Sequence, residues 1–365
     1  MATQSLLYST FFLLVVAIVV ASSRQIIKTL PGFDGDLPFK LETGYVGVGE
    51  LDDVQLFYYF IESERSPGDD PLVLWLTGGP GCSAFSGLVY EIGPLSFDYE
   101  NSKPYLPNLT LNPYSWTKVA NIIFLDAPVG TGFSYAKTWQ GYSNMDDILS
   151  AAETYSFLRK WLIAHPKFVA NPLYISGDSY SGIIVPIVVQ HISDDIDAGN
   201  EPRMNLKGYT LGNPATYLNK DINSRVWFAY LNALISQDIY ESAKRNCKGE
   251  YVDVDPSNGL CIADLQNIKV CIGKLFTANI YEPQCSYVSP AEPNKKFKWD
   301  RSSSSFFMKE EEEEEDSINF LFLSTDHNET AEPPRPWCRN YNCLYSYSWA
   351  NDIDVQRALG IRGEQ

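Results

Sequence analysis

The sequence predicts an α/β protein in which helices cover both faces of a mostly parallel sheet. Three observations support this class. Short apolar runs that are typical of buried strands alternate with stretches of helical periodicity. One of these runs, Leu173–Ser176, leads into a tight turn that has Ser179 at its apex and is followed by a helix-compatible segment. The composition is globular, with 45% hydrophobic and 20% charged residues in a chain of 365 residues.

The first 23 residues have the pattern of a secretory signal peptide. Leu6–Ala21 is almost entirely apolar, and Ala21-Ser22-Ser23 supplies small residues for cleavage. The apolar stretch is short for a membrane span, which needs about 20 residues, and an uncleaved signal anchor is the alternative interpretation. We therefore expect entry into the secretory pathway and no membrane association once the signal is removed.

Residues 24–220 carry the pattern of the sheet domain. The alternation Val54–Phe60 predicts antiparallel strands within Leu41–Ile61. Strands and helices are then expected in alternation at Pro71–Leu76, Ala120–Leu125, Met145–His165, Ile183–Ile192 and Leu206–Leu211.

The pattern changes after Asp221, and residues 221–289 are interpreted as a helical cap inserted into the sheet domain. Arg225–Ala243 has helical character, and four cysteines follow within Cys247–Cys285. Residues 290–336 contain a serine run, a glutamate run and a proline cluster, which indicates a disordered or excised linker. Residues 337–365 return to folded character, as the start of the C-terminal part of the sheet domain.

Charge and cysteine usage limit the class of partner. A net charge of −17 argues against nucleic acid or an anionic membrane as a partner. In a secretory context the seven cysteines indicate disulfides, and with three histidines in the chain no cluster has the spacing of a metal site. We expect no metal and no cofactor. Asn108 and Asn328 stand in N-glycosylation tripeptides.

The candidate nucleophile is Ser179. An apolar strand, a sharp turn and a helix are the layout of a nucleophile elbow, and Gly177 and Gly182 flank the serine where the turn is too tight for side chains. The N-terminus of the following helix would stabilise developing negative charge. Ser181 stands where the usual motif has its second glycine. This motif alone therefore leaves two interpretations open, a nucleophile elbow and an ordinary strand–turn–helix connection.

A second motif supplies bare backbone. Gly78 and Gly79 follow a predicted buried strand, and without side chains their amides can approach a substrate oxygen. An oxyanion hole needs two such donors about 3 Å from the developing charge. Alone, this Gly-Gly-Pro-Gly run is a tight turn; together with the Ser179 elbow it favours an oxyanion hole.

Three motifs together carry a family resemblance. Trp75–Ser83, Asp126–Tyr135 and Gly177–Gly182 resemble those of serine carboxypeptidases of the α/β-hydrolase fold, and more closely those of plant serine carboxypeptidase-like acyltransferases. The resemblance covers roughly Lys28–Arg362. A plant family of this kind implies an extracellular or vacuolar location.

The resemblance implies a role for several residues. Ser179 would be the nucleophile, and the amides of Gly79 and Tyr180 would form the oxyanion hole. The substrate would be an acyl group on the anomeric oxygen of glucose. Ser179 would take the acyl group, and an acceptor hydroxyl would then remove it.

Substrate-binding positions distinguish two branches of the family. Thr77, Gly78 and Asp178 are expected to line the substrate site. The peptidases usually have asparagine at the position of Thr77 and glutamate at that of Asp178, where these side chains help to hold the free carboxylate of a peptide. Asp178 is shorter by one C–C bond, about 1.5 Å, which is enough to break a direct hydrogen bond. Both residues match the acyltransferase pattern, and a serine carboxypeptidase that binds a peptide C-terminus is the alternative.

The cysteine pairing also follows from the resemblance. The implied bridges are Cys82–Cys338, Cys247–Cys261 and Cys271–Cys285, with the last two in the cap. Cys343 is then left over and is interpreted as a buried apolar residue rather than a reactive thiol. Excision of the linker would leave two disulfide-linked chains.

The remaining members of a catalytic triad are not found at the expected places. In α/β-hydrolases an aspartate and then a histidine follow the nucleophile, and in this family both follow the segment that resembles Trp349–Leu359. The chain ends at Gln365. The resemblance therefore implies a truncated form that lacks the last sheet elements, and an inactive isoform is a further alternative.

None of the three histidines is a convincing substitute. His165 precedes the nucleophile at a predicted helix end, and His191 lies about 18 Å along the helix that follows Ser179. His327 falls in the predicted linker. Asp352 is interpreted as a helix cap.

Overall fold

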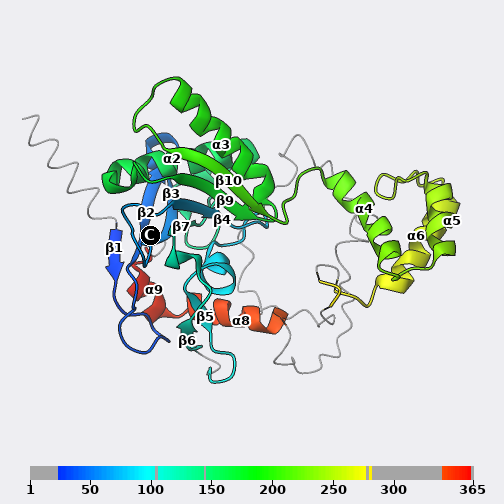
Figure 1. Ribbon diagram of the computed structural model, residues 1–365, viewed down its shortest axis with the longest axis horizontal. Coiled ribbons are helices and arrows are strands. Elements are labelled where there is room, and N and C mark those ends of the chain that lie inside the picture. Colours follow the sequence, from blue (N-terminus) through cyan, green and yellow to red (C-terminus); the bar gives the residue numbers. More distant parts are fainter. Residues whose placement is uncertain (1–23, 103–105, 144, 277–278, 282–338, 363–365) are drawn as a thin grey trace, which may run out of the picture. The chain divides into compact units, whose positions relative to one another are not determined.

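The computed structural model describes residues 24–102, 106–143, 145–276, 279–281 and 339–362 (Figure 1). The chain divides into two compact units. Among the described residues, the first unit comprises 24–214 and 345–362, and the second comprises 215–281 and 339–344. The predicted signal peptide and the predicted linker lie outside the described residues.

The strands are β1 (Arg24–Ile27), β2 (Leu41–Val48), β3 (Val54–Ile61), β4 (Leu72–Leu76), β5 (Leu95–Phe97), β6 (Leu109–Leu111), β7 (Asn121–Leu125), β8 (Tyr135–Ala136), β9 (Leu173–Asp178) and β10 (Leu206–Gly212). The α-helices are α2 (Asp147–Ala164), α3 (Ser181–Asp197), α4 (Leu218–Leu231), α5 (Gln237–Cys247), α6 (Gly259–Ile272), α8 (Arg339–Ala350) and α9 (Ile353–Leu359). Short helical turns are η1 (Glu50–Asp52), η2 (Gly87–Glu91), η3 (Trp116–Lys118), η4 (Trp139–Tyr142) and η5 (Pro166–Phe168).

The main sheet of the first unit has the order β1-β2-β3-β7-β4-β9-β10, with β8 paired to β3. Strands β7, β4, β9 and β10 are parallel to one another, whereas β1, β2 and β3 join them through antiparallel pairs. Because β7, β4 and β9 are central, both faces of each need cover, and accordingly β4, the last four residues of β7 and the first three of β9 carry apolar or aromatic side chains.

Helices cover both faces of this sheet (Figure 1). On one face α2 and α3 contribute Trp161 and Val188 to a core that includes Leu74 and Ile175 of the sheet. On the other face the end of α8 and α9 pack with the turn η2, and Trp349 stacks on Phe85 with ring centroids 5.0 Å apart. The expected α/β class, with a sheet between two helical layers, is confirmed.

The parallel strands bring their following loops to one edge of the sheet. Strands β4, β7 and β9 end at Leu76, Leu125 and Asp178, and the carboxyl ends of parallel strands meet at the same edge. The three motifs noted in the sequence begin within or directly after these strands. The sheet therefore assembles segments that are 40 to 100 residues apart into one candidate site.

The second unit is helical. Helices α4, α5 and α6 surround a small core that includes Val226, Tyr240 and Ile268. A disulfide joins Cys247 at the end of α5 to Cys261 in α6, as predicted. The prediction of one helix at Arg225–Ala243 is wrong in one respect, because this stretch contains parts of two helices, α4 and α5. The Ser236 side chain caps the N-terminus of α5, so a new helix starts there.

The strands and helices predicted between residues 41 and 211 are otherwise confirmed to within a few residues. Among the described residues, no helix has both the length and the apolar character that crossing a membrane requires.

Candidate active site

Ser179 stands on a sharp strand-to-helix turn. Strand β9 ends at Asp178 and helix α3 begins at Ser181, and Ser179 between them has a φ of 54°. A left-handed backbone at a non-glycine residue is strained, and such strain gathers at functional sites. The Ser179 amide donates to the Gly212 carbonyl of β10 at 2.9 Å, which fixes the turn against the next strand. The side chain is exposed, so its hydroxyl is accessible.

Glycine is required on the strand side of this turn. A Cβ on Gly177 would lie 2.3 Å from the Leu76 carbonyl oxygen and 2.4 Å from Ser181 Oγ. The Ser181 hydroxyl donates to the Asp178 carbonyl at 2.6 Å, so the serine in place of the usual second glycine is part of the turn. The geometry is that of a nucleophile elbow.

The glycine-rich loop (Thr77–Ser83) lies directly against the elbow. A Cβ on Gly78 would lie 2.6 Å from Ser179 Cβ, 2.6 Å from the Tyr180 nitrogen and 2.9 Å from Ser179 Oγ. No side chain can occupy this position without displacing the serine. The bare backbone at Gly78 therefore allows the loop to approach the hydroxyl.

Two amides at this contact are free to bind an oxygen. The Gly78 amide donates to Asp178 Oδ1 at 3.3 Å, so it is already engaged. Within the described part of the chain, the amides of Gly79 and Tyr180 donate to no protein acceptor. Gly79 has a φ of 117°, a conformation that other residues rarely adopt. These are the two donors that the sequence analysis proposed.

Two carboxyl groups lie near the loop, and the sequence analysis found only one of them. Burial raises the pKa of Asp178, opposed by its hydrogen bond from Gly78. Burial also raises the pKa of Glu91 to about 7, with the charge of Asp178 as the second cause. Glu91 ends η2, and no motif in the sequence marked it. Thr77 Oγ1 accepts a hydrogen bond from Ser86 at 3.5 Å.

Asp126 ties the glycine-rich loop to the loop that follows β7. Its carboxyl group is fully buried and accepts hydrogen bonds from Ser83 Oγ at 2.6 Å, the Ala84 amide at 3.0 Å and the Phe133 amide at 2.9 Å. Burial raises its pKa to about 6 in spite of these bonds. A Cβ on Gly132 would lie 2.0 Å from Asp126 Oδ2, which explains that glycine.

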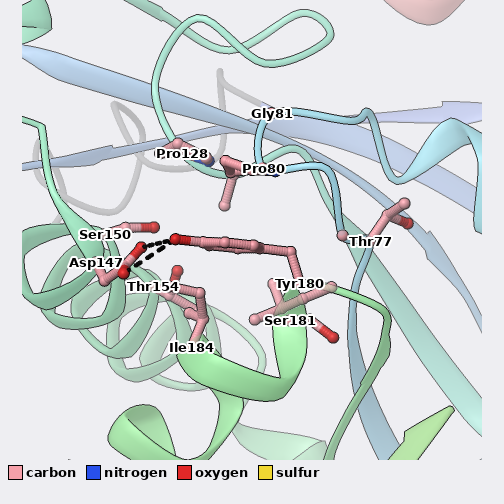
Figure 2. Close-up of a pocket in the computed structure, with 13 residues that line it drawn as sticks. Thr77, Pro80, Gly81, Pro128, Asp147, Ser150, Thr154, Tyr180, Ser181 and Ile184 are labelled. Atoms are coloured by element: carbon pink, nitrogen blue, oxygen red, sulfur yellow. Dashed lines mark hydrogen bonds between the residues drawn. The ribbon is translucent and has the colours of Figure 1, made fainter. Parts of the chain in front are cut away.

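A pocket opens beside the elbow (Figure 2). The glycine-rich loop, the loop after β7, and helices α2 and α3 line it, and Tyr180 and Ser181 contribute to the wall. The Tyr180 hydroxyl donates to both oxygens of Asp147 at 3.1 Å. Asp147 was not predicted as part of the site, because it lies 33 residues from Tyr180 in the sequence and no motif links the two.

Neither described histidine is placed to activate Ser179. His165 is buried, where Nε2 lies 2.7 Å from Glu42 and Nδ1 lies 2.8 Å from the Trp161 carbonyl oxygen. His191 lies within α3, where its ring stacks on Tyr155. Asp352 caps α9 by accepting hydrogen bonds from the amides of Asp354 and Val355, as expected.

Other predicted sites are only partly described. Cys82 and Cys271 carry free thiols in this structure, and their predicted partners Cys338 and Cys285 lie outside the described residues, so both bridges stay predictions. Asn108 is half-buried, and its side-chain nitrogen donates to the Asn101 carbonyl at 3.0 Å. Asn328 lies outside the described residues. The expectation that Cys343 is buried is wrong, because that residue is exposed.

Comparison with known proteins gives a consistent result. The family model described as serine carboxypeptidase matches residues 31–365. Serine carboxypeptidase-like 19 of Arabidopsis thaliana is 42% identical over 365 residues, which cover 99% of this chain and 74% of that protein. Serine carboxypeptidase-like 1 of the same plant is 50% identical, over 94% of this chain and 67% of that protein.

Some similar relatives are matched over a smaller share of their length. Serine carboxypeptidase-like 12 of Arabidopsis thaliana is 51% identical over 73% of this chain and 61% of that protein. These plant relatives are longer than the chain, which spans about two thirds of each.

A solved structure shows the fold. Kex1(delta)p, a prohormone-processing carboxypeptidase from Saccharomyces cerevisiae, superposes with a TM-score of 0.62 at 19% identity, covering 94% of this chain and 68% of that one. The fold is the α/β-hydrolase fold, with the nucleophile elbow after β9 and the glycine-rich loop after β4. With this fold, these motifs and relatives of up to 51% identity, the chain belongs to the serine carboxypeptidase family.

Proposed function

We propose that the chain is a serine carboxypeptidase-like acyltransferase that moves an acyl group from a glucose ester to an acceptor hydroxyl. Ser179 Oγ attacks the ester carbonyl carbon and gives its proton to a base. The carbonyl oxygen becomes negative, and the amides of Gly79 and Tyr180 donate to it. Collapse of this intermediate releases glucose, whose anomeric oxygen takes a proton, and leaves the acyl group on Ser179. The acceptor hydroxyl then attacks the acyl-serine in the same way.

The observation that most supports an ester substrate over a peptide substrate is the hydrogen bond from the Gly78 amide to Asp178. A peptidase must hold the free carboxylate of its substrate with donors next to the elbow. Here Asp178 already takes the Gly78 donor, and Thr77 offers a hydroxyl where an amide side chain would be needed. An ionised Asp178 also repels a second carboxylate at short distance.

A carboxypeptidase activity is the second candidate, because the family model that matches the chain is described as serine carboxypeptidase. Cleavage of a blocked dipeptide, with an acyl-Ser179 intermediate that water removes, would be the expected reaction.

Within the described residues, no histidine is placed to act as the base for Ser179. His165 and His191 are both engaged elsewhere, so neither is placed to take the proton of Ser179. Loss of a base typically costs several orders of magnitude in rate while a residual acceleration from the oxyanion hole remains. The chain is proposed to act in the secretory pathway, either outside the cell or in the vacuole.

Acyl capture on Ser179 tests the proposal directly. The chain is incubated with 1-O-acyl glucoses and separately with blocked dipeptides, at pH 5 and at pH 7, and digested for mass spectrometry. We expect the mass of the acyl group on the peptide that contains Ser179, and transfer to an added alcohol. Ser179→Ala is the matched control. Release of amino acids without acyl transfer would assign the chain to the peptidases, and absence of any adduct would contradict both activities.

A further inference from the structure

Tyr180 is held by a carboxyl group from a different helix. Its hydroxyl donates to both oxygens of Asp147 at 3.1 Å. Asp147 is the first residue of α2, and Tyr180 directly precedes α3. The contact therefore fastens the start of one helix to the start of the other. Tyr180 also carries one of the two backbone amides near Ser179 that donate to no acceptor among the described residues.

The tyrosine ring fills the space under the glycine-rich loop. Figure 2 shows the ring lying across the pocket, with Pro80 on one side, Thr154 and Ile184 on the other, and the hydroxyl directed at Asp147. Both ends of the side chain are thus fixed: the backbone by the elbow, and the hydroxyl by Asp147. A side chain that is anchored at its far end restricts rotation of its own backbone.

Electrostatics favour this anchor. Burial raises the pKa of Asp147, whereas the hydrogen bond from Tyr180 and the N-terminus of α2, in whose first turn it lies, favour its negative charge. Burial, together with the charge of Asp147 and the hydrogen bond to it, raises the pKa of Tyr180 to about 12, so the phenol keeps its proton and donates. A hydrogen bond to an ionised acceptor is roughly twice as strong as one between neutral groups.

The elbow tolerates little displacement of this amide. The Tyr180 nitrogen lies so near Gly78 that a Cβ there would be 2.6 Å away. An oxyanion donor acts only when it lies about 3 Å from the developing charge, and a misplacement of about 1 Å can reduce a rate roughly 100-fold. Small rotations at Tyr180 would therefore be felt at Ser179.

We propose that Asp147 is a positioning residue for acyl transfer, which holds the Tyr180 amide in place through the Tyr180 side chain. The assignment rests on the proposed function, because it gives the Tyr180 amide the role of an oxyanion donor. Asp147 itself touches no reacting atom in this scheme.

A second tyrosine–aspartate contact between the same helices provides a matched control. The Tyr155 hydroxyl of α2 donates to Asp195 of α3, and Asp195 lies 16 residues after Ser179 in the sequence, near the far end of the helix. Removing this bond loosens the same pair of helices without touching Tyr180. Tyr155→Phe and Asp195→Ala are therefore the counterparts of Tyr180→Phe and Asp147→Ala.

The experiment measures fluorophosphonate labelling of Ser179 in the full 365-residue chain, with the maximal labelling rate separated from probe affinity. We expect Asp147→Ala and Tyr180→Phe each to lower the maximal rate about 10- to 100-fold with probe affinity unchanged. The double variant should be no slower than either single one, because both remove the same contact. Asp147→Asn, which keeps an acceptor oxygen, should recover part of the rate. Tyr155→Phe and Asp195→Ala should label at the wild-type rate.

Hydrogen exchange of residues 178–184 gives a readout that does not depend on chemistry. We expect Asp147→Ala to speed exchange there, and Asp195→Ala to leave it unchanged. Unchanged exchange and labelling in Asp147→Ala, or equal slowing by the Asp195 variant, would overturn the assignment. If the wild-type chain takes no label while exchange responds as expected, the proposed function fails and the anchoring of Tyr180 stands. Should Asp147→Ala not fold, Asp147→Asn and Tyr180→Phe decide the question.

Discussion

At the scale of single residues, Gly78 lies directly against Ser179. The loop backbone passes so near the serine that a Cβ on Gly78 would lie 2.6 Å from Ser179 Cβ and from the Tyr180 nitrogen. Real Cβ atoms do not approach other atoms so closely, so either the loop or the elbow must move when a side chain is added. Both movements displace the candidate nucleophile from its donors.

Gly78→Ala should therefore abolish acylation of Ser179 while the rest of the sheet stays folded. We expect the rate to fall at least 100-fold, since a displacement of about 1 Å is enough for that loss. Labelling of Ser179 by a fluorophosphonate measures the rate, and far-UV circular dichroism checks the fold. Gly68→Ala is the control, because a Cβ there meets nothing within 4 Å. Normal labelling of Gly78→Ala would show that the loop does not form the site.

Sequence reasoning identified the residues of the site that are marked by backbone requirements. Ser179, Gly78 and Gly79 were predicted because a tight turn and a bare loop restrict the residues that can occupy them. Asp147 and Glu91 were missed. Their importance depends on contacts with residues 33 and 87 positions away, and a single sequence carries no sign of such pairs.

At the scale of elements, the site depends on three parallel strands that end at one edge of the sheet. Apolar runs predicted β4, β7 and β9 because strands buried on both faces are mostly apolar. The boundary between α4 and α5 was harder to predict. Tyr230 and Tyr240 lie on different helices with their rings stacked, and helical character continues across the connection, so only the cap at Ser236 marks the break.

The disulfide of the second unit leads to a prediction about α5 and α6. Cys247 and Cys261 close a loop across 14 positions, for which the chain-entropy model gives a stabilisation of about 3 kcal/mol. The second unit has a small apolar core, so this contribution is a large part of its stability. The double variant Cys247→Ser, Cys261→Ser should exchange amide hydrogens of α5 and α6 much faster, by about 100-fold or more.

The same measurement contains its own reference. Helices α2 and α3 pack in the main core of the first unit, so their exchange should not change in this variant. Protection of α5 and α6 equal to that of the wild type would show that packing of the three helices, rather than the bridge, stabilises the second unit.

At the scale of the whole molecule, the fold followed from the sequence because strand, turn and helix signals agreed along the first unit. Polar groups placed inside the resulting core did not follow from it. Glu153 of α2 is 6% exposed, and its Oε2 atom has no hydrogen-bond partner among the described residues. Helical periodicity places such a residue on α2 and gives no reason for a carboxyl group on its buried side.

These buried carboxyl groups determine how stability depends on pH. Burial raises the pKa of Glu153 to about 7, with the charge of Asp53 as a second cause, and burial raises that of Asp126 to about 6. The unfolded values are about 4.3 and 3.9. Between the unfolded and folded values the folded state binds more protons, so the free energy of unfolding falls as pH rises through this window. At 1.36 kcal/mol per pKa unit, acidification from pH 7.5 to pH 5 should stabilise the protein by about 2–4 kcal/mol.

The opposite trend should follow in stronger acid. A hydrogen bond from Arg65, followed by one from Ser63, lowers the pKa of Asp70 to about 2. Its contribution is complete above the unfolded value of about 3.9 and is lost as pH falls toward 2. Stability should therefore be highest near pH 4 to 5.

Denaturant titrations at pH 5 and pH 7.5 test this account, with tryptophan fluorescence as the readout. The double variant Asp126→Asn, Glu153→Gln should lose the part of the difference that these two groups contribute, because neither side chain then titrates. Glu91, whose pKa is also raised to about 7, should keep its own part. Asp34→Asn, Glu50→Gln is the control, since both of those carboxyl groups are exposed. General repulsion from the net charge of −17 also weakens in acid, but 0.5 M salt screens it and leaves buried groups almost unaffected. A pH dependence that disappears in salt, or that is as large in the Asp126, Glu153 variant as in the wild type, would contradict the role of these two groups.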